Sequence, residues 1–188
     1  MLLLIGGLVL FLGIHLLPAI PALRASAAEQ WGERRYKGVF SLVSAIGLVM
    51  IVAGYMIADP NPRVFAPFPA ARRIAPYAMT LSFILFAAAN MRGHLRHAVR
   101  HPMLLGLGTW AAVHLLANGD LRGTVLFGAF LAFAVVDLFS AVQRGAVKAF
   151  VPEGKFDGMA IAGGTAVALV VMLLHRFLFG VPAAGFSL

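Results

Sequence analysis

Six long apolar stretches, separated by short polar connections, dominate the pattern of this chain. Each stretch holds 18 to 23 residues, and about 20 helical residues cross the hydrocarbon core of a bilayer. None of them shows the alternation with period two that a membrane barrel requires. The pattern therefore predicts an all-α polytopic membrane protein, a bundle of six transmembrane helices. The six windows are Met1 to Leu23, Gly38 to Ala58, Ile74 to Met91, His101 to Gly119, Gly123 to Gln143 and Gly158 to His175.

The connections between these windows are too short to hold a soluble domain, since none exceeds 15 residues. No P-loop or dinucleotide-binding fingerprint is present either. The chain is therefore expected to form a single transmembrane domain over residues 1–188. The connections are Arg24 to Lys37, Asp59 to Arg73, Arg92 to Arg100, Asp120 to Arg122 and Arg144 to Asp157.

The composition agrees with a protein that uses a lipid bilayer as its solvent. Apolar residues make up 61% and charged residues 12% of the chain, against roughly 45–50% and 25% in soluble domains. The net charge of +8 lies in the short connections, which indicates membrane orientation rather than a nucleic-acid surface. Because there is no cysteine, thiolate ligation and covalent haem attachment are excluded.

The basic residues are unequally divided between the two sides of the expected bundle. The first, third and fifth connections carry ten, and the other side carries five. By the positive-inside rule, both termini are predicted on the outer side of the membrane. The ten are Arg24, Arg34, Arg35, Lys37, Arg92, Arg96, Arg100, Arg144, Lys148 and Lys155, and the five are Arg63, Arg72, Arg73, Arg122 and Arg176.

Prolines and small residues punctuate the helical pattern. Pro18 and Pro21 are expected to end the first span, and the segment from Asp59 to Pro69 is expected to form an extended outer loop. Ala160 and Gly164 form a small-xxx-small pair in the sixth window, which predicts close helix packing.

Three ionisable residues are expected at one level inside the bundle. The first helix runs inward and the fourth runs outward, so His15 and His101 both lie near the cytoplasmic side. Asp137, on the fifth helix, lies near the same level. Ionisable residues within a span are functional candidates by default. Two interpretations of Asp137 remain open: a partner of Arg144, or a carboxylate that orients a ligating imidazole.

Two further histidines are candidates at the opposite side. Thirteen residues advance about 20 Å along a helix, so His114 cannot share a metal with His101. His114 instead lies near the depth of His175 on the sixth helix, and a second, outer pair is possible on this spacing. His94, His97 and His101 would share one face if a single helix ran through them, which leaves a zinc site as an alternative to a basic face that contacts lipid headgroups.

The segment HPMLLGLGTWAAVHLLANGDL, from His101 to Leu121, resembles the NnrU family of membrane proteins. The shared positions include His101-Pro102, Gly106, Trp110, His114 and Asn118-Gly119-Asp120. The segments FLGIHLLPAIPALR and GERRYKGVFSLVSAIGL extend the resemblance over nearly the whole chain.

The NnrU family is similar to zeta-carotene isomerase, an integral membrane haem b protein that isomerises a central cis double bond of a carotenoid precursor. This resemblance implies that His15 and His101 bracket a haem iron, with Asp137 in support. It also implies a redox-gated isomerase-like activity, or a role linked to nitric oxide in denitrification with nitric oxide or an apolar small molecule as ligand.

Two alternatives to a haem protein are left open. One is a non-catalytic assembly factor for a nitrite or nitric oxide reductase. The other is a membrane methyltransferase that uses S-adenosylmethionine, because Arg100-His101-Pro102 resembles a motif of those enzymes. The chain has no paired glutamates, which such methyltransferases carry.

Overall fold

The computed structural model describes residues 1–184, and this part of the chain is helical apart from its connections. The described residues form eight α-helices and one 3₁₀-helix. These elements are α1 (Leu2–Leu16), η1 (Leu17–Ala19), α2 (Pro21–Trp31), α3 (Glu33–Ile57), α4 (Pro69–Ala88), α5 (His94–Val99), α6 (Pro102–Asn118), α7 (Leu121–Gln143) and α8 (Gly154–Phe179).

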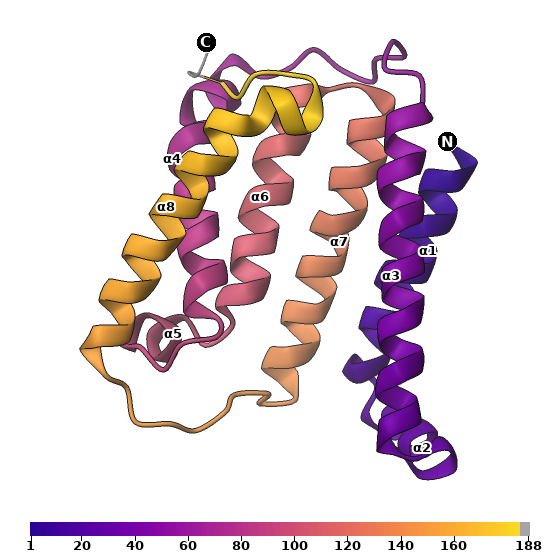
Figure 1. Ribbon diagram of the computed structural model, residues 1–188, viewed down its shortest axis with the longest axis vertical. Helices are drawn as coiled ribbons and strands as arrows, with labels where there is room; N and C mark the ends of the chain where they lie inside the picture. The colour runs from indigo at the N-terminus through magenta and orange to yellow at the C-terminus, as the bar shows by residue number, and fades with distance from the viewer. Residues whose placement is uncertain (185–188) are drawn as a thin grey trace.

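The long helices run side by side along the long axis of the molecule, and the short helices α2 and α5 lie at one end (Figure 1). We call this end, formed by residues 17–37, 89–101 and 144–153, the α2 end. The opposite end, formed by residues 58–68 and 119–120, also carries the start of α1 and the last turn of α8, and we call it the terminal end. The chain therefore begins at the end of the bundle where α8 finishes.

Four helices of the described chain are long and apolar enough to cross a membrane. They correspond to Leu2–Ala19, Glu33–Ile57, Leu121–Gln143 and Gly154–Phe179. All six windows are helical, but the expected number of six spans is not confirmed by this measure. The helix α6 has only 17 residues, and α4 carries Arg72 and Arg73 in its first turns.

Helices α1 and α3 pack closely because glycines remove side chains from their contact. A Cβ atom added at Gly54 would collide with the backbone of Leu4, and one at Gly7 would lie 2.6 Å from the amide nitrogen of Ile51. Leu4, Leu8 and Ile51 form the buried apolar cluster beside these glycines. Small residues allow backbones to approach in this way where lipid supplies no hydrophobic driving force.

A second group forms around α4, which packs against both α6 and α8. The buried hydroxyl of Ser82 donates to the carbonyl oxygen of Gly106 at 2.8 Å and joins α4 to α6. On the other side, a Cβ at Gly164 would collide with the backbone of Ile84, and Ala160 is buried. The predicted small-xxx-small packing in the sixth window is thus confirmed.

Helix α7 connects the two groups. It packs along α6 and also contacts α1 and α3, so it lies between the α1–α3 pair and the α4–α6–α8 group (Figure 1). The residues of α7 therefore face both halves of the bundle.

Some helix boundaries differ from those that the sequence predicts. The first window is not one helix, because α1 passes into η1 and breaks at Ile20 before α2 begins. Pro18 and Pro21 do end the first span, as predicted. Pro69, expected in the extended loop, instead opens α4, where its missing N–H costs nothing.

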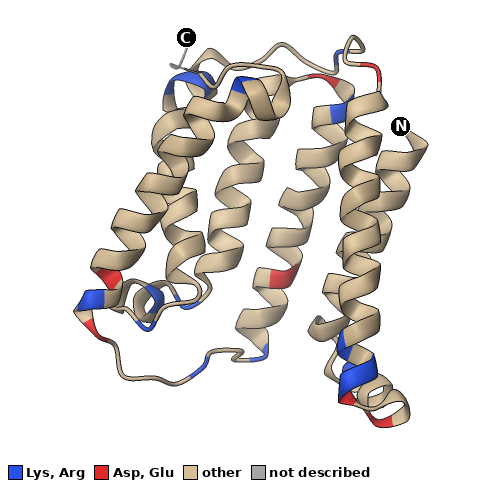
Figure 2. Cartoon of the chain, viewed as in Figure 1, with Lys and Arg blue, Asp and Glu red and all other residues tan. Residues whose placement is uncertain are grey.

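The basic residues gather at the two ends of the helices, and the shafts between them are almost free of charge (Figure 2). Arg24 and Lys37 belong to the α2 end, whereas Arg63 and Arg122 belong to the terminal end. This distribution follows the loops in which the sequence carries its charge.

Candidate functional site

His15 lies near the end of α1 with one ring nitrogen already engaged. Its Nδ1–H donates to the carbonyl oxygen of Phe11 at 2.6 Å, so Nε2 is the ring nitrogen that this bond leaves unengaged. The ring lies 4.3 Å from that of Phe11, 5.1 Å from Phe40 of α3 and 6.5 Å from Phe133 of α7. Three helices thus surround one oriented, partly buried imidazole with aromatic rings.

His101 occupies the position directly before α6. Arg100 has a positive φ of 60°, so the chain turns sharply there before Pro102 begins the helix. Because α1 ends and α6 begins at the α2 end, His15 and His101 belong to the same end of the bundle (Figure 1). Within residues 1–184, however, no hydrogen bond or ring contact joins the two side chains, and α7 packs between their helices.

His114 and His175 are the two histidines that the described structure brings into ring contact. Their ring centroids lie 6.5 Å apart with an interplanar angle of 22°. His114 donates from Nδ1 to the carbonyl oxygen of Trp110 at 2.9 Å, and His175 donates from Nδ1 to that of Val181 at 2.7 Å. The equal depth predicted for His114 and His175 therefore corresponds to a ring contact in the structure. The two hydrogen bonds leave the Nε2 atom of each ring unengaged.

Aromatic rings connect this pair to His15. His114 lies 5.3 Å from the ring of Trp110 and 4.8 Å from that of Phe127. The ring of Phe130, on α7, lies 5.5 Å from Trp110 and 6.0 Å from Phe11. An apolar aromatic layer, carried largely by α7, thus lies between the two histidine centres.

Asp137 faces Arg144 rather than an imidazole. The Arg144 Nη2 atom lies 3.6 Å from Asp137 Oδ1, and the two side chains are 29% and 21% exposed. Arg144 also donates to the carbonyl oxygen of Pro18 at 3.0 Å, while Ser140 lies 3.5 Å from that of Ala19. Of the two interpretations that the sequence leaves open, the structure has the ion pair.

The three histidines at 94, 97 and 101 do not form one face. The continuous helix that this arrangement requires is absent, because α5 ends at Val99 and Arg100 breaks the chain before α6. His94 bonds Asp157 at 2.9 Å, and the ring of His97 lies 6.0 Å from that of Phe150. In residues 1–184, no three histidine or carboxylate side chains gather as a metal site.

Sequence reasoning missed the role of Asp157 in this region. Its carboxylate accepts the backbone N–H groups of His94 and Leu95 at 2.9 and 2.8 Å, and so caps the start of α5 from the first turn of α8. Nearby, Glu153 pairs with Lys155 at 2.6 Å, and this hydrogen bond is the main cause that lowers the pKa of Glu153. The capping residue belongs to another helix, distant in sequence. No local sequence motif therefore predicts this contact.

The segment Asn118-Gly119-Asp120 forms the turn from α6 to α7. Asn118 donates to the carbonyl oxygen of His114 at 2.8 Å, and Gly119 adopts a φ of 76° that closes α6. Asp120 accepts the N–H of Gly123 at 2.8 Å as the N-cap of α7. This turn fixes the last turns of α6, on which His114 lies.

The fold and the site together define an all-helical protein with helices that can cross a membrane and with histidines oriented among aromatic rings. The NnrU family model, described as NnrU protein, matches residues 3–183 of the chain. The chain therefore belongs to the NnrU family. No curated protein and no solved structure matches it.

Proposed function

We propose that the chain is an integral membrane haem b protein in which all six long helices cross a bacterial inner membrane. The observation that carries the proposal is the hydrogen bonding of three imidazole rings. His15, His114 and His175 each direct Nδ1–H to a backbone carbonyl oxygen, at 2.6, 2.9 and 2.7 Å. Histidines that bind a metal almost always fix their second nitrogen in this way, which sets the tautomer and the ring orientation.

The residues that would hold the haem are His15 and His101, the pair that the family resemblance implies. His15 offers Nε2 among the rings of Phe11, Phe40 and Phe133, an apolar setting that suits a porphyrin. His101 belongs to the same end of the bundle. Asp137 and Arg144 support this layer by holding α7 against η1.

When bound, haem iron with two imidazole ligands supplies redox chemistry and a site for a small ligand such as nitric oxide or an apolar molecule. The chain's own contribution would be to hold the imidazoles in a fixed orientation and to exclude water with aromatic side chains.

A reduced-minus-oxidised optical spectrum of protein produced with ample haem and purified in detergent tests the proposal. We expect a Soret band and an α-band in the wild type, and loss or shift of both in His15→Ala and in His101→Ala. His97→Ala is the matched control, because the ring contact of His97 within residues 1–184 is with Phe150. This variant should leave the spectrum unchanged. Purified wild-type protein without haem absorption would contradict the proposal.

A second ligand pair is favoured by the ring contact of His114 with His175. The same spectra recorded for His114→Ala and His175→Ala decide between the pairs. If these two variants lose the bands while His15→Ala and His101→Ala keep them, the haem lies near the terminal end, and the first assignment is wrong.

Activity assays on the purified protein, without partners, distinguish a catalyst from an assembly factor. Turnover of a cis polyene, or consumption of nitric oxide, by the haem-loaded protein would identify an enzyme. Haem binding with neither activity would favour an assembly role for a nitrite or nitric oxide reductase. Binding of radiolabelled S-adenosylmethionine would instead favour the methyltransferase alternative.

The proposed topology can be tested directly because the chain contains no cysteine. Single substitutions Asn61→Cys at the terminal end and Ser26→Cys at the α2 end should differ in labelling by an impermeant maleimide applied to intact cells. Six spans with both termini outside predict labelling at Asn61→Cys and protection at Ser26→Cys. The reverse pattern would invert the orientation.

A further inference from the structure

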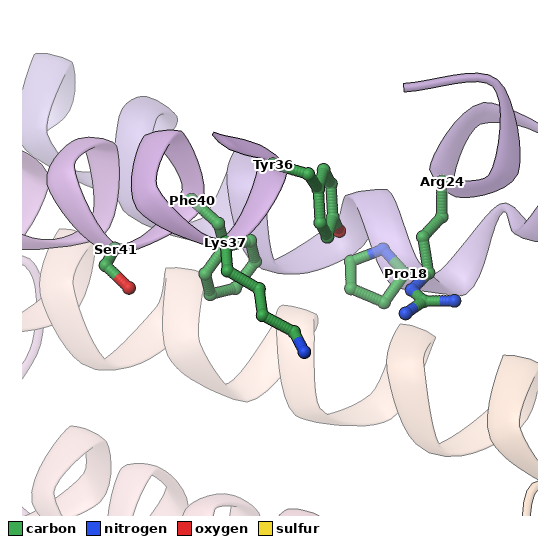
Figure 3. Close-up of a pocket in the computed structure, with 6 residues that line it drawn as sticks. All are labelled: Pro18, Arg24, Tyr36, Lys37, Phe40 and Ser41. Atoms are coloured by element: carbon green, nitrogen blue, oxygen red, sulfur yellow. The ribbon is translucent and has the colours of Figure 1, made fainter. Parts of the chain in front are cut away.

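A pocket opens at the α2 end, and it shares Phe40 with the surroundings of His15. It has a volume of about 350 Å³ and lies where η1, α2 and α3 meet (Figure 3). Its lining combines two cations, two aromatic rings, a hydroxyl group and a proline: Arg24, Lys37, Tyr36, Phe40, Ser41 and Pro18. We call this the Arg24–Lys37 pocket.

The two cations line one side of the pocket together. The Arg24 and Lys37 side chains converge, so that their charged ends lie on one side of the pocket, near Pro18 (Figure 3). Both contact a single carboxylate oxygen, Oε1 of Glu33, at 3.2 and 3.3 Å. One negative charge thus faces two positive charges, and the pocket retains an excess of positive charge.

Exposed apolar side chains lie close in sequence to these cations. The candidate span Leu2–Ala19 ends beside the pocket, and the segment that follows it exposes Ile20 before α2 and Leu23 and Trp31 within α2. Tryptophan and exposed aliphatic residues next to a charged rim are typical of helices that lie in the membrane interface. An occupant that carries an anionic head and an apolar tail matches both parts of the surface.

We propose that the Arg24–Lys37 pocket binds the phosphate headgroup of an anionic phospholipid, whose acyl chains pack beside Ile20, Leu23 and Trp31. The phosphate takes the place of the Glu33 carboxylate on one or both cations. Arg24 is suited to this role because its guanidinium offers several N–H donors to phosphate oxygens. The proposal does not depend on haem.

Native mass spectrometry of the full-length protein, titrated with phosphatidylglycerol or phosphatidylcholine, tests this site. We expect tighter binding of phosphatidylglycerol by the wild type. The double variant Arg24→Gln/Lys37→Gln should weaken it about tenfold or more, since each cation near the surface attracts anionic lipid. Phosphatidylcholine binding should not change. The proposal is wrong if the double variant binds phosphatidylglycerol like the wild type.

Arg34→Gln/Arg35→Gln is the matched control, because it removes the same charge from the same connection but not from the pocket lining. We expect phosphatidylglycerol affinity within about twofold of the wild type. An equal loss in both double variants would mean that diffuse charge, and not this pocket, attracts the lipid.

Glu33→Gln separates ligand binding from structural damage. It breaks the same two ion pairs as the double variant, but it frees both cations. We therefore expect tighter phosphatidylglycerol binding, whereas a purely structural role of the ion pairs predicts weaker binding. Inorganic phosphate at millimolar concentration should not displace the lipid, and full displacement would identify a site for free anions instead.

Discussion

Arg144 donates from Nη1 to the carbonyl oxygen of Pro18 at 3.0 Å, across 126 positions of sequence. This bond joins the end of α7 to η1, at the point where the first span stops. The same guanidinium forms an ion pair with Asp137. One side chain thus joins α7 to η1 and also neutralises a carboxylate within the apolar part of α7.

Replacing Arg144 by methionine should therefore destabilise the α2 end. Arg144→Met leaves Asp137 without its ion pair and Pro18 without its donor, and we expect the free energy of unfolding to fall by about 1–3 kcal/mol. Thermal unfolding in detergent measures the change, and Lys148→Met on the exposed connection serves as the control. Adding Asp137→Asn should recover part of the loss; an additive further loss would show that the pair contributes nothing.

The contact of α1 with α3 should not tolerate a side chain at Gly54. Because an added Cβ would meet the backbone of Leu4, Gly54→Val is expected to cost about 1–3 kcal/mol through overpacking. Gly38→Val on the same helix is the control, since its added Cβ would meet no atom of another helix within 4 Å. Equal midpoints of thermal unfolding for the two variants would refute the proposed close packing.

Removal of the Asp157 carboxylate should loosen α5. Asp157→Ala deletes the acceptor of the His94 and Leu95 N–H groups, and the loss of such a cap costs about 1 kcal/mol. Hydrogen exchange should accelerate roughly fivefold at these two amides, which is that cost expressed as a rate. Glu29→Ala, at an exposed position of α2, should leave both rates unchanged.

Arg122 should be needed for the terminal end of the bundle. Its Nη1 donates to the carbonyl oxygens of Tyr55 and Ala58 at 3.1 and 3.2 Å, and its guanidinium lies 4.6 Å from the centre of the Tyr55 ring. We expect Arg122→Leu to lose about 1–3 kcal/mol and to expose residues 58–68 to protease, because the last carbonyls of α3 lose their donor.

Two variants check this interpretation of Arg122. Arg122→Lys should rescue only partly, since one ammonium cannot reproduce the flat guanidinium over the ring. Arg73→Leu removes an exposed charge from the same end and should stay close to wild type. Proteolysis that is equally fast in Arg73→Leu would mean that charge alone protects the loop.

The helices themselves could be predicted because lipid leaves the backbone little choice. A long apolar run must satisfy its N–H and C=O groups internally, so each of the six windows is largely helical, although the first is broken at Ile20. Pro18 and Pro21 end the first of them because a proline ring interferes with the preceding helical turn. This effect is local, so the sequence alone predicts it. The roles of Asp157 and Arg122 could not be predicted in this way, because each side chain stabilises the end of a helix that is distant in sequence.

Sequence by itself determined the depth of each histidine, since a helix advances a fixed distance per residue, and it correctly set His114 level with His175. Only the tertiary structure decided lateral position. His15 and His101 belong to one end of the bundle, yet α7 packs between their helices. The reason is that α1 packs against α3 through glycines, whereas α6 packs against α4 and α7. Rotation and neighbour choice depend on packing between distant segments, and no local pattern encodes them.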